Sequence, residues 1–423
     1  MKDSGIEWIG EIPEGWEVAP IRSCFDEVRT KKTNGQEQNA LQFKFGNIIS
    51  KTNFNANADD YVADAITNYT VVLPDTVMIN GLNLNYDFKS LRVALVKEKG
   101  VITSAYLAIF PDRKKISPQY ATYLFKGYET KMAFHNMGAG IRKTLGYKEF
   151  KNQPLLLPSE KEQNKISAYL DSKCSHIDIM LSKIRSSIEE YKKLKQAVIT
   201  QAVTKGVRGE REMKDSGVEW IGEIPKEWVC EKIKYATSIS RGLFNHRPRN
   251  DERYYNGKYP FIQTGDVANA TKYIVSYSQT LNELGKSVSK EFPKGTLTMT
   301  IAANVGDVAI LNFDAYFPDS VVGFVPNKNI RTLYLFYVFS AMKDEFIRTA
   351  IKSTQLNLNI DRVKETFIPV TLNVNEQCEI ENYLESKCAE IDGLIAKKEQ
   401  LVKELESYKK SLIYEVVTGK REV

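Results

Sequence analysis

The sequence is poor in the residues that build disulfide frameworks and zinc sites. Its 423 residues include five cysteines, an odd number, and none of them forms a Cys-x-x-Cys pair. Such sparse cysteines in a large chain exclude a secreted disulfide scaffold. The three histidines, His135, His176 and His246, have no cysteine partner at zinc-ligand spacing. We therefore predict no metal site in this chain.

Long apolar runs are also lacking. The longest, Leu333–Met342, is too short to span a bilayer, and the first residues form no apolar signal segment. We therefore expect a soluble, cytoplasmic protein. The net charge of +6 permits an anionic partner but is equally compatible with plain solubility.

Motifs for catalysis and cofactor binding are missing as well. Gly285-Lys286-Ser287 resembles the end of a phosphate loop, but Thr280 occupies the position of its first glycine. No glycine-rich dinucleotide fingerprint follows a predicted strand, and no Asn-Pro-Pro or Asp-Pro-Pro segment could hold a flipped base. We predict that this chain has no catalytic residue and binds no cofactor, which favours a binding protein over an enzyme.

What the sequence does contain is an internal repeat. Residues 1–16 recur as residues 213–228 with thirteen of sixteen positions identical, and residues 162–178 return as residues 376–392. The segments between these repeats share almost no similarity. Repeated flanking segments around dissimilar central segments indicate two binding sites of different specificity. We expect four segments, which are residues 1–158, 159–212, 213–371 and 372–423.

Two of these segments have the pattern of a coiled-coil helix. Apolar residues alternate at spacings of four and three, and the pattern recurs 214 residues later. One such stripe is unstable alone, so we expect the two helices to pack on each other, antiparallel because of the pseudo-twofold repeat. The predicted interface consists of Ile177, Leu181, Ile184, Ile188, Tyr191, Val198, Ile391, Ile395, Val402, Leu405, Leu412 and Val416.

The other two segments contain short runs rich in β-branched and aromatic residues, such as Tyr69–Ile79 and Thr296–Ile301, which are typical of strands. Each also contains one amphipathic helical pattern, at Ser117–Asn136 and at Lys328–Ile351. The predicted fold class is α+β, with two α/β domains in tandem repeat and two long helices that form an antiparallel coiled coil.

The variable segments carry clusters of basic, amide and aromatic side chains on loops. Arg or Lys can bond guanine, Asn or Gln can bond adenine, and all of them can contact phosphates. A single residue of this kind is more often a turn former or a solvated surface residue, but the clusters together favour contact with double-stranded DNA. The candidates are Lys31, Lys32, Asn83, Asn85, Lys89, Arg142, Lys143 and Tyr147, then Arg241, His246, Arg247, Arg249, Arg253, Gln355, Asn357 and Asn359.

The order of these motifs resembles that of the specificity subunit of type I restriction-modification systems, and the resemblance covers essentially the whole chain. It rests on Ile-Pro-x-x-Trp at 12–16 and 224–228, Gly-Leu-Asn-Leu-Asn-Tyr at 81–86, Gly-Ile-Arg-Lys-Thr-Leu at 140–145, Ser-Thr-Gln-Leu-Asn-Leu-Asn at 353–359, and Glu-Gln at 162–163 and 376–377. The resemblance implies two target-recognition domains that read the halves of a split, asymmetric DNA sequence, at a separation set by the coil.

The resemblance also implies partners. Two adenine methyltransferase (modification) subunits would dock on the helices, and ATP-dependent restriction subunits with endonuclease and translocase activity would join them. AdoMet, ATP and Mg²⁺ would then be bound by the partner subunits. The residues alone leave two alternatives open, which are a non-catalytic scaffold that binds proteins and carries a coiled-coil spacer, and a fused nuclease or methyltransferase.

Overall fold

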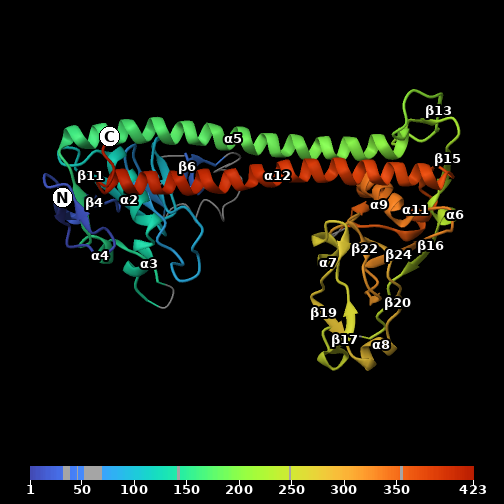
Figure 1. Ribbon diagram of the computed structural model, residues 1–423. Helices are drawn as coiled ribbons and strands as arrows, with labels where there is room; N and C mark the ends of the chain where they lie inside the picture. The colour runs from blue at the N-terminus through green and yellow to red at the C-terminus, as the bar shows by residue number, and fades with distance from the viewer. Residues whose placement is uncertain (32–38, 45, 52–68, 141–142, 247–248, 353–355) are drawn as a thin grey trace. The chain divides into compact units, whose positions relative to one another are not determined.

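The structure, a computed structural model, describes residues 1–31, 39–44, 46–51, 69–140, 143–246, 249–352 and 356–423. The chain divides into two compact units. The first unit comprises Met1–Arg185 with Glu399–Val423, and the second comprises Ser186–Lys398. Each unit contains strands, short helices and one part of each long helix (Figure 1).

The first unit is built around an antiparallel four-stranded sheet of order β4-β11-β8-β9. Strand pairs β1-β2, β3-β12, β5-β6 and β7-β10 surround it. The strands are β1 (Lys2–Asp3), β2 (Glu11–Ile12), β3 (Glu17–Pro20), β4 (Phe25–Glu27), β5 (Leu41–Lys44), β6 (Asn47–Ser50), β7 (Thr70–Val72), β8 (Val77–Ile79), β9 (Val93–Leu95), β10 (Gly100–Ile102), β11 (Leu107–Pro111) and β12 (Pro154–Leu157). The short helices are η1 (Ile21–Ser23), α2 (Pro118–Thr130), α3 (Ala133–Met137) and α4 (Tyr147–Phe150).

The second unit has a five-stranded sheet of order β16-β24-β21-β22-β18 and a four-stranded sheet of order β19-β17-β23-β20. Its strands are β13 (Met213–Asp215), β14 (Glu223–Pro225), β15 (Val229–Lys232), β16 (Thr237–Arg241), β17 (Tyr255–Phe261), β18 (Tyr273–Ile274), β19 (Gln279–Leu281), β20 (Glu291–Phe292), β21 (Leu297–Thr300), β22 (Val308–Leu311), β23 (Ala315–Tyr316), β24 (Val321–Pro326), β25 (Ile351–Lys352), β26 (Leu356–Asn357) and β27 (Phe367–Val370). Its short helices are α6 (Ile233–Ala236), η2 (Glu252–Tyr254), α7 (Thr264–Asn269), α8 (Glu283–Ser287), α9 (Thr332–Ala341), α10 (Lys343–Thr349) and α11 (Ile360–Glu365).

The amphipathic helix expected in each half is interrupted. In the first unit α2 ends at Thr130 and α3 begins at Ala133, because Met132 adopts a left-handed φ of 52°. In the second unit Met342 separates α9 from α10. The prediction of one continuous helix at each of these places is therefore wrong.

The long helices α5 (Glu160–Lys205) and α12 (Val374–Val417) are antiparallel in both units. In the first unit Lys409 Nζ lies 2.6 Å from Asp178, and in the second unit Lys195 Nζ lies 2.6 Å from Asp392. Other ion pairs follow the same direction, since Arg208 contacts Glu379 at 2.7 Å. Lys195 and Lys409, which occupy equivalent positions of the repeat where the apolar spacing is interrupted, thus each pair with the opposite helix. These half-exposed pairs each contribute about 0.2–1 kcal/mol.

The residues of the predicted seam are buried or half-buried. Fully buried are Ile177, Leu181, Ile188, Ile391, Leu412 and Val416. Half-buried are Ile184, Tyr191, Val198, Ile395, Val402 and Leu405. The seam merges with the cores of the domains, because Ile177 and Leu412 belong to the core of the first unit.

A buried glutamine fixes the start of each long helix. The Gln163 side chain accepts the N–H of Ser117 at 2.8 Å and donates to the carbonyls of Lys115 and Pro158. Gln377 makes the corresponding bonds, since it accepts the N–H of Arg331 at 2.8 Å and donates to the carbonyls of Asn329 and Thr371. Each glutamine therefore ties its long helix to the segment that begins α2 or α9.

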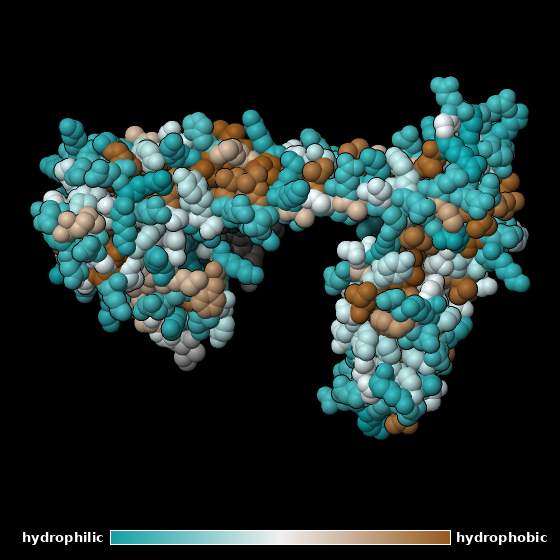
Figure 2. All heavy atoms as spheres, viewed as in Figure 1, coloured by the Kyte–Doolittle hydropathy of each residue, from teal (hydrophilic) through white to brown (hydrophobic). Residues whose placement is uncertain are grey.

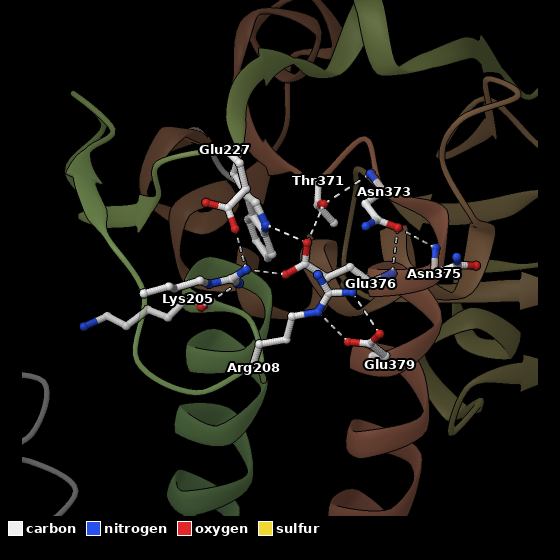
Figure 3. A network of polar contacts seen from close by, with 10 residues as sticks. Lys205, Arg208, Glu227, Thr371, Asn373, Asn375, Glu376 and Glu379 are labelled. Carbon is white, nitrogen blue, oxygen red and sulfur yellow. Dashed lines mark hydrogen bonds and ion pairs between the residues drawn. The ribbon is translucent and has the colours of Figure 1, made fainter.

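The neighbouring glutamate binds the tryptophan of the Ile-Pro-x-x-Trp motif. The Trp16 indole donates to Glu162 at 3.3 Å, and the Trp228 indole donates to Glu376 at 3.1 Å. Glu162 is exposed, whereas Glu376 is 1% exposed and also accepts from Thr371 and Arg211 (Figure 3). In each unit the Ile-Pro-x-x-Trp motif and the Glu-Gln motif are thus joined by a hydrogen bond, and we call this arrangement the clamp. The clamp is buried more deeply in the second unit.

Helix α2 also holds a half-buried carboxylate. Glu129 accepts the backbone N–H of Arg92, the residue that precedes β9. Burial raises the pKa of Glu129 to about 7, although the Arg92 N–H and the positive charges of Lys126, Arg92 and Lys410 act in the opposite direction.

We expect Trp228→Phe to destabilise its unit more than Trp16→Phe destabilises the first. Both changes remove the same atoms, but only Trp228→Phe takes a hydrogen bond from a buried carboxylate, which costs about 1–3 kcal/mol. Chemical denaturation of both variants measures the difference. Equal losses of unfolding free energy would show that burial of the glutamate is irrelevant to the clamp.

The stability of the protein should fall as pH rises toward 7 because of Glu129. Its folded pKa exceeds its ordinary value of 4.5, so the folded state binds the proton more tightly. The resulting stabilisation is complete below about pH 4.5 and is lost as pH rises through the folded pKa. Glu129→Gln should abolish this part of the pH dependence, measured by denaturation at about pH 5 and about pH 8. An unchanged pH profile in the variant would contradict the assignment.

Candidate nucleic-acid interface

In the first unit the candidate interface centres on the β8–β9 loop (Asn80–Ser90), which connects two adjacent strands of the sheet. Asn83 in this loop has a left-handed φ of 51° and is exposed, as is Lys89. Asn85 is half-buried. Leu84, between the two asparagines, is 1% exposed and anchors the loop in the core. The loop therefore turns its polar residues outward over a buried leucine.

A second segment lies against this loop. The N–H of Leu84 donates to the carbonyl of Lys143 at 3.2 Å, and the N–H of Leu145 donates to the carbonyl of Gly81 at 2.9 Å. A Cβ at Gly81 would lie 2.5 Å from the Leu145 oxygen, so only glycine permits this approach. The exposed Lys143 is thereby brought beside the loop. The candidate Arg142 lies outside the described residues.

Arg92 points into this loop from its far end. Its side chain is 1% exposed and donates from Nη1 to the carbonyls of Asn80 at 2.9 Å and Leu82 at 3.0 Å. Nη2 donates to the carbonyl of Asp87 and lies 3.7 Å from the Asp87 carboxylate. The buried guanidinium group therefore binds backbone carbonyls of the loop.

The remaining candidates of the first unit lie elsewhere. Lys31 is exposed and forms an isolated β-bridge with Thr70, and Lys32 lies outside the described residues. The half-buried Tyr147 donates its hydroxyl to the carbonyl of Phe25 at 2.6 Å, and burial raises the pKa of this tyrosine. The structure thus groups Asn83, Asn85, Lys89 and Lys143, and does not place Tyr147 with its hydroxyl free toward a ligand.

In the second unit the candidate arginines gather around two aspartates. Arg241 Nε donates to the Asp319 carbonyl at 2.5 Å, and the exposed Arg249 binds the Asp319 carboxylate. Arg253 and His246 both bind Asp251, at 2.6 Å and 3.0 Å. The hydrogen bond from Arg253, foremost, holds the pKa of Asp251 well below its usual range. Arg247 lies outside the described residues.

Asn359 approaches this region through the backbone. Its side chain accepts the N–H of Asp361 at 2.8 Å and so caps α11. The preceding Leu358 donates its N–H to Ile301, which in turn donates to Ser320, the neighbour of Asp319. The two polar clusters of the second half are therefore linked by two backbone hydrogen bonds. Gln355 and the side chain of Asn357 lie outside the described residues.

Other exposed groups lie near these loops. Tyr86 is 74% exposed at the β8–β9 loop, and Phe88 stacks on His135 with ring centroids 5.1 Å apart. In the second unit Lys286 and Lys258 lie 4.5 Å and 5.2 Å from the Tyr259 ring centroid. The pairing of β17 with β19 brings these lysines together, and no local pattern signals it.

Neither a candidate metal-binding cluster nor a membrane-spanning helix is found among the described residues. Within them, no three His, Cys, Asp or Glu side chains are grouped so that they could hold a metal ion. None of the helices in the described part of the chain combines the length and the apolar character needed to cross a bilayer. The five cysteines are free thiols. The polar loops described above supply hydrogen-bonding groups and charged side chains.

Comparison with known proteins finds one matching family model and several similar proteins. Residues 239–404 match the model of the type I restriction modification DNA specificity domain. A Methanocaldococcus jannaschii protein named as the MjaX specificity subunit of a type I restriction enzyme is 24% identical, over 97% of this chain and 95% of its own length. The MjaVIII specificity subunit of that organism is 23% identical, over 97% of this chain and 93% of its own length.

Solved structures show the same fold. A chain from a structure of the complex assembly and conformational transition of the type I R-M system has a TM-score of 0.73 at 15% identity, and the match covers 97% of this chain and 100% of that one. The HsdS subunit from Thermoanaerobacter tengcongensis has a TM-score of 0.51 at 14% identity, with coverage of 97% and 98%. The predicted tandem α+β fold with two packed long helices is confirmed. Residues 239–404 therefore belong to the type I restriction modification DNA specificity domain family, and the chain as a whole is similar to type I specificity subunits in sequence and fold.

Proposed function

We propose that this chain reads a bipartite, asymmetric site in double-stranded DNA, with one half-site read by each unit. The supporting observation is the contrast between frame and loops. Both units repeat the glutamine and tryptophan bonds at the start of their long helices. Their exposed polar residues, however, stand on different elements, which are the β8–β9 loop in the first unit and residues 241–259 in the second. Two units that share the same framework but expose different polar residues are suited to two different half-sites.

The chemistry of the second unit suits a phosphate backbone. The guanidinium groups of Arg249 and Arg253 are exposed and bound to carboxylates, so a phosphate can take over the same fork geometry. Lys258 and Lys286 add charge beside the ring of Tyr259. Phosphate contacts of this kind fix orientation, while amides and tyrosines can address base edges.

We propose further that the long helices position two methyltransferase subunits, which restriction subunits then join. Hydrophobic side chains gather on the surface over these helices (Figure 2). Leu194 in the second unit and Tyr408 in the first occupy equivalent repeat positions, and each is 48% exposed. One equivalent apolar position in each unit fits two copies of one partner. AdoMet, ATP and Mg²⁺ would be bound by those partners.

Arg249→Ala and Arg253→Ala should each weaken DNA binding by the complex assembled with its methyltransferase subunits. Each lost phosphate contact lowers the slope of log K against log salt by about 1. Sequence preference, measured by methylation of a random DNA library, should relax in only one half-site. Lys397→Ala, an exposed lysine of α12 in the same unit, is the matched control. Wild-type preference and slope in both arginine variants would refute the proposed contacts.

Leu194→Glu and Tyr408→Glu should each release one methyltransferase subunit, because a charge in a desolvated contact is costly. The mass of the complex then drops by one subunit in either variant and by two in the double variant. Lys397→Glu, an exposed position on the same pair of helices, controls for added charge. Full assembly in the double variant would place the partners elsewhere.

A further inference from the structure

We propose that Arg92 is a positioning residue for recognition of the first half-site, acting through the β8–β9 loop without touching DNA. This inference rests on the proposed function of the first unit. It assigns to a buried arginine a role in specificity, whereas the exposed residues Asn83, Tyr86 and Lys89 would make the contacts.

Several backbone carbonyls of the loop converge on the Arg92 side chain. Arg92 donates to the carbonyls of Asn80, Leu82 and Asp87, which span most of the loop. A guanidinium offers five N–H donors in a fixed plane, and an ammonium offers three on a flexible stem. Only arginine can therefore hold these three carbonyls in one planar arrangement. Burial of its charge lowers the pKa of Arg92, and the nearby Asp87 and Glu129 act in the opposite direction.

Little of the loop backbone is held by the sheet. The Asn80 N–H still donates to the Arg92 carbonyl at 2.7 Å, and beyond this bond the loop leaves the sheet. Its tip is a local turn in which the Asp87 carboxylate accepts the N–H groups of Lys89 at 3.1 Å and Ser90 at 3.0 Å. Hydrogen bonds to Ser90, foremost, lower the pKa of Asp87 to about 2. Asp87 is thus charged, and its own carbonyl is bound by Arg92, which joins the tip to the base of the loop.

The bonds from Arg92 hold the loop residues that are exposed for contact. Base-edge contacts require side chains held close to their productive geometry, and buried supporting residues provide that precision. Asn83 stands in a left-handed conformation between the carbonyls of Leu82 and Asp87 that Arg92 holds. Tyr86 immediately precedes Asp87 and is 74% exposed. A change at position 92 therefore shifts contact residues while β8 and β9 keep their own pairing.

The test uses the full chain assembled with its methyltransferase subunits and compares Arg92→Lys with wild type. Arg92→Lys keeps the charge and loses the planar fork. We expect preference at one half-site to relax about tenfold or more, with the other half-site unchanged. The salt slope of binding should stay at the wild-type value, because no phosphate contact is lost. Hydrogen exchange of the loop amides should accelerate, with β8 and β9 unaffected.

Two further variants sharpen the outcome. Lys89→Ala, on the exposed side of the same loop, should lower the salt slope by about 1 with less effect on preference. Asp87→Asn keeps the carbonyl that Arg92 binds and removes the facing charge, so it should relax the same half-site to a smaller extent.

Three results would overturn the proposal. They are a salt slope reduced by about 1 in Arg92→Lys, equal loss at both half-sites, or unchanged preference in both Arg92→Lys and Asp87→Asn. Failure of the proposed function is a distinct result, because the wild-type complex would then show no bipartite preference at all.

Discussion

The two units depend on the hydrogen bonds at the first turn of each long helix. Gln163 and Gln377 satisfy backbone groups that would otherwise be buried without partners, both at the end of the preceding strand and at the start of α2 or α9. One side chain thereby joins three elements. Because the bonds run to backbone atoms, the sequences of the joined segments can change freely, which permits two different domains to share one frame.

The clamp does not fix the surfaces that we propose to contact DNA. Other residues support these surfaces in each unit. In the first unit the support comes from a buried arginine that replaces the sheet's hydrogen bonds where β8 and β9 end. In the second it comes from two carboxylates, Asp251 and Asp319, that hold arginines at the surface. Ion pairs at the surface are weak, so the second surface is organised with less energy than the first.

Much of this architecture could be predicted because it is written in local patterns. The four-and-three spacing predicted the paired helices. Repetition of Trp and Glu-Gln marked equivalent positions in the two halves, but it did not predict that these residues bond to each other. The break at Met132 could not be predicted, since neither glycine nor proline marks it. The direction of the Arg92 side chain could not be predicted either, because a sequence does not distinguish an arginine that binds its own loop from one that faces solvent. The meeting of Lys258 and Lys286 at Tyr259 depends on pairing between distant strands.

The two uses of arginine have different consequences for binding. Arg92 makes its bonds before any ligand arrives, so the contribution to recognition that we propose for it would already be present in the free protein. Arg249 and Arg253 are bound to aspartates in the free protein, and contact with a phosphate requires them to exchange one anion for another. The net gain is then the difference between two charge-assisted bonds, and it is smaller than the phosphate contact alone. In the DNA complex that we propose, the aspartates would thereby limit non-specific attraction to DNA, while the arginines would remain oriented for a correctly placed backbone.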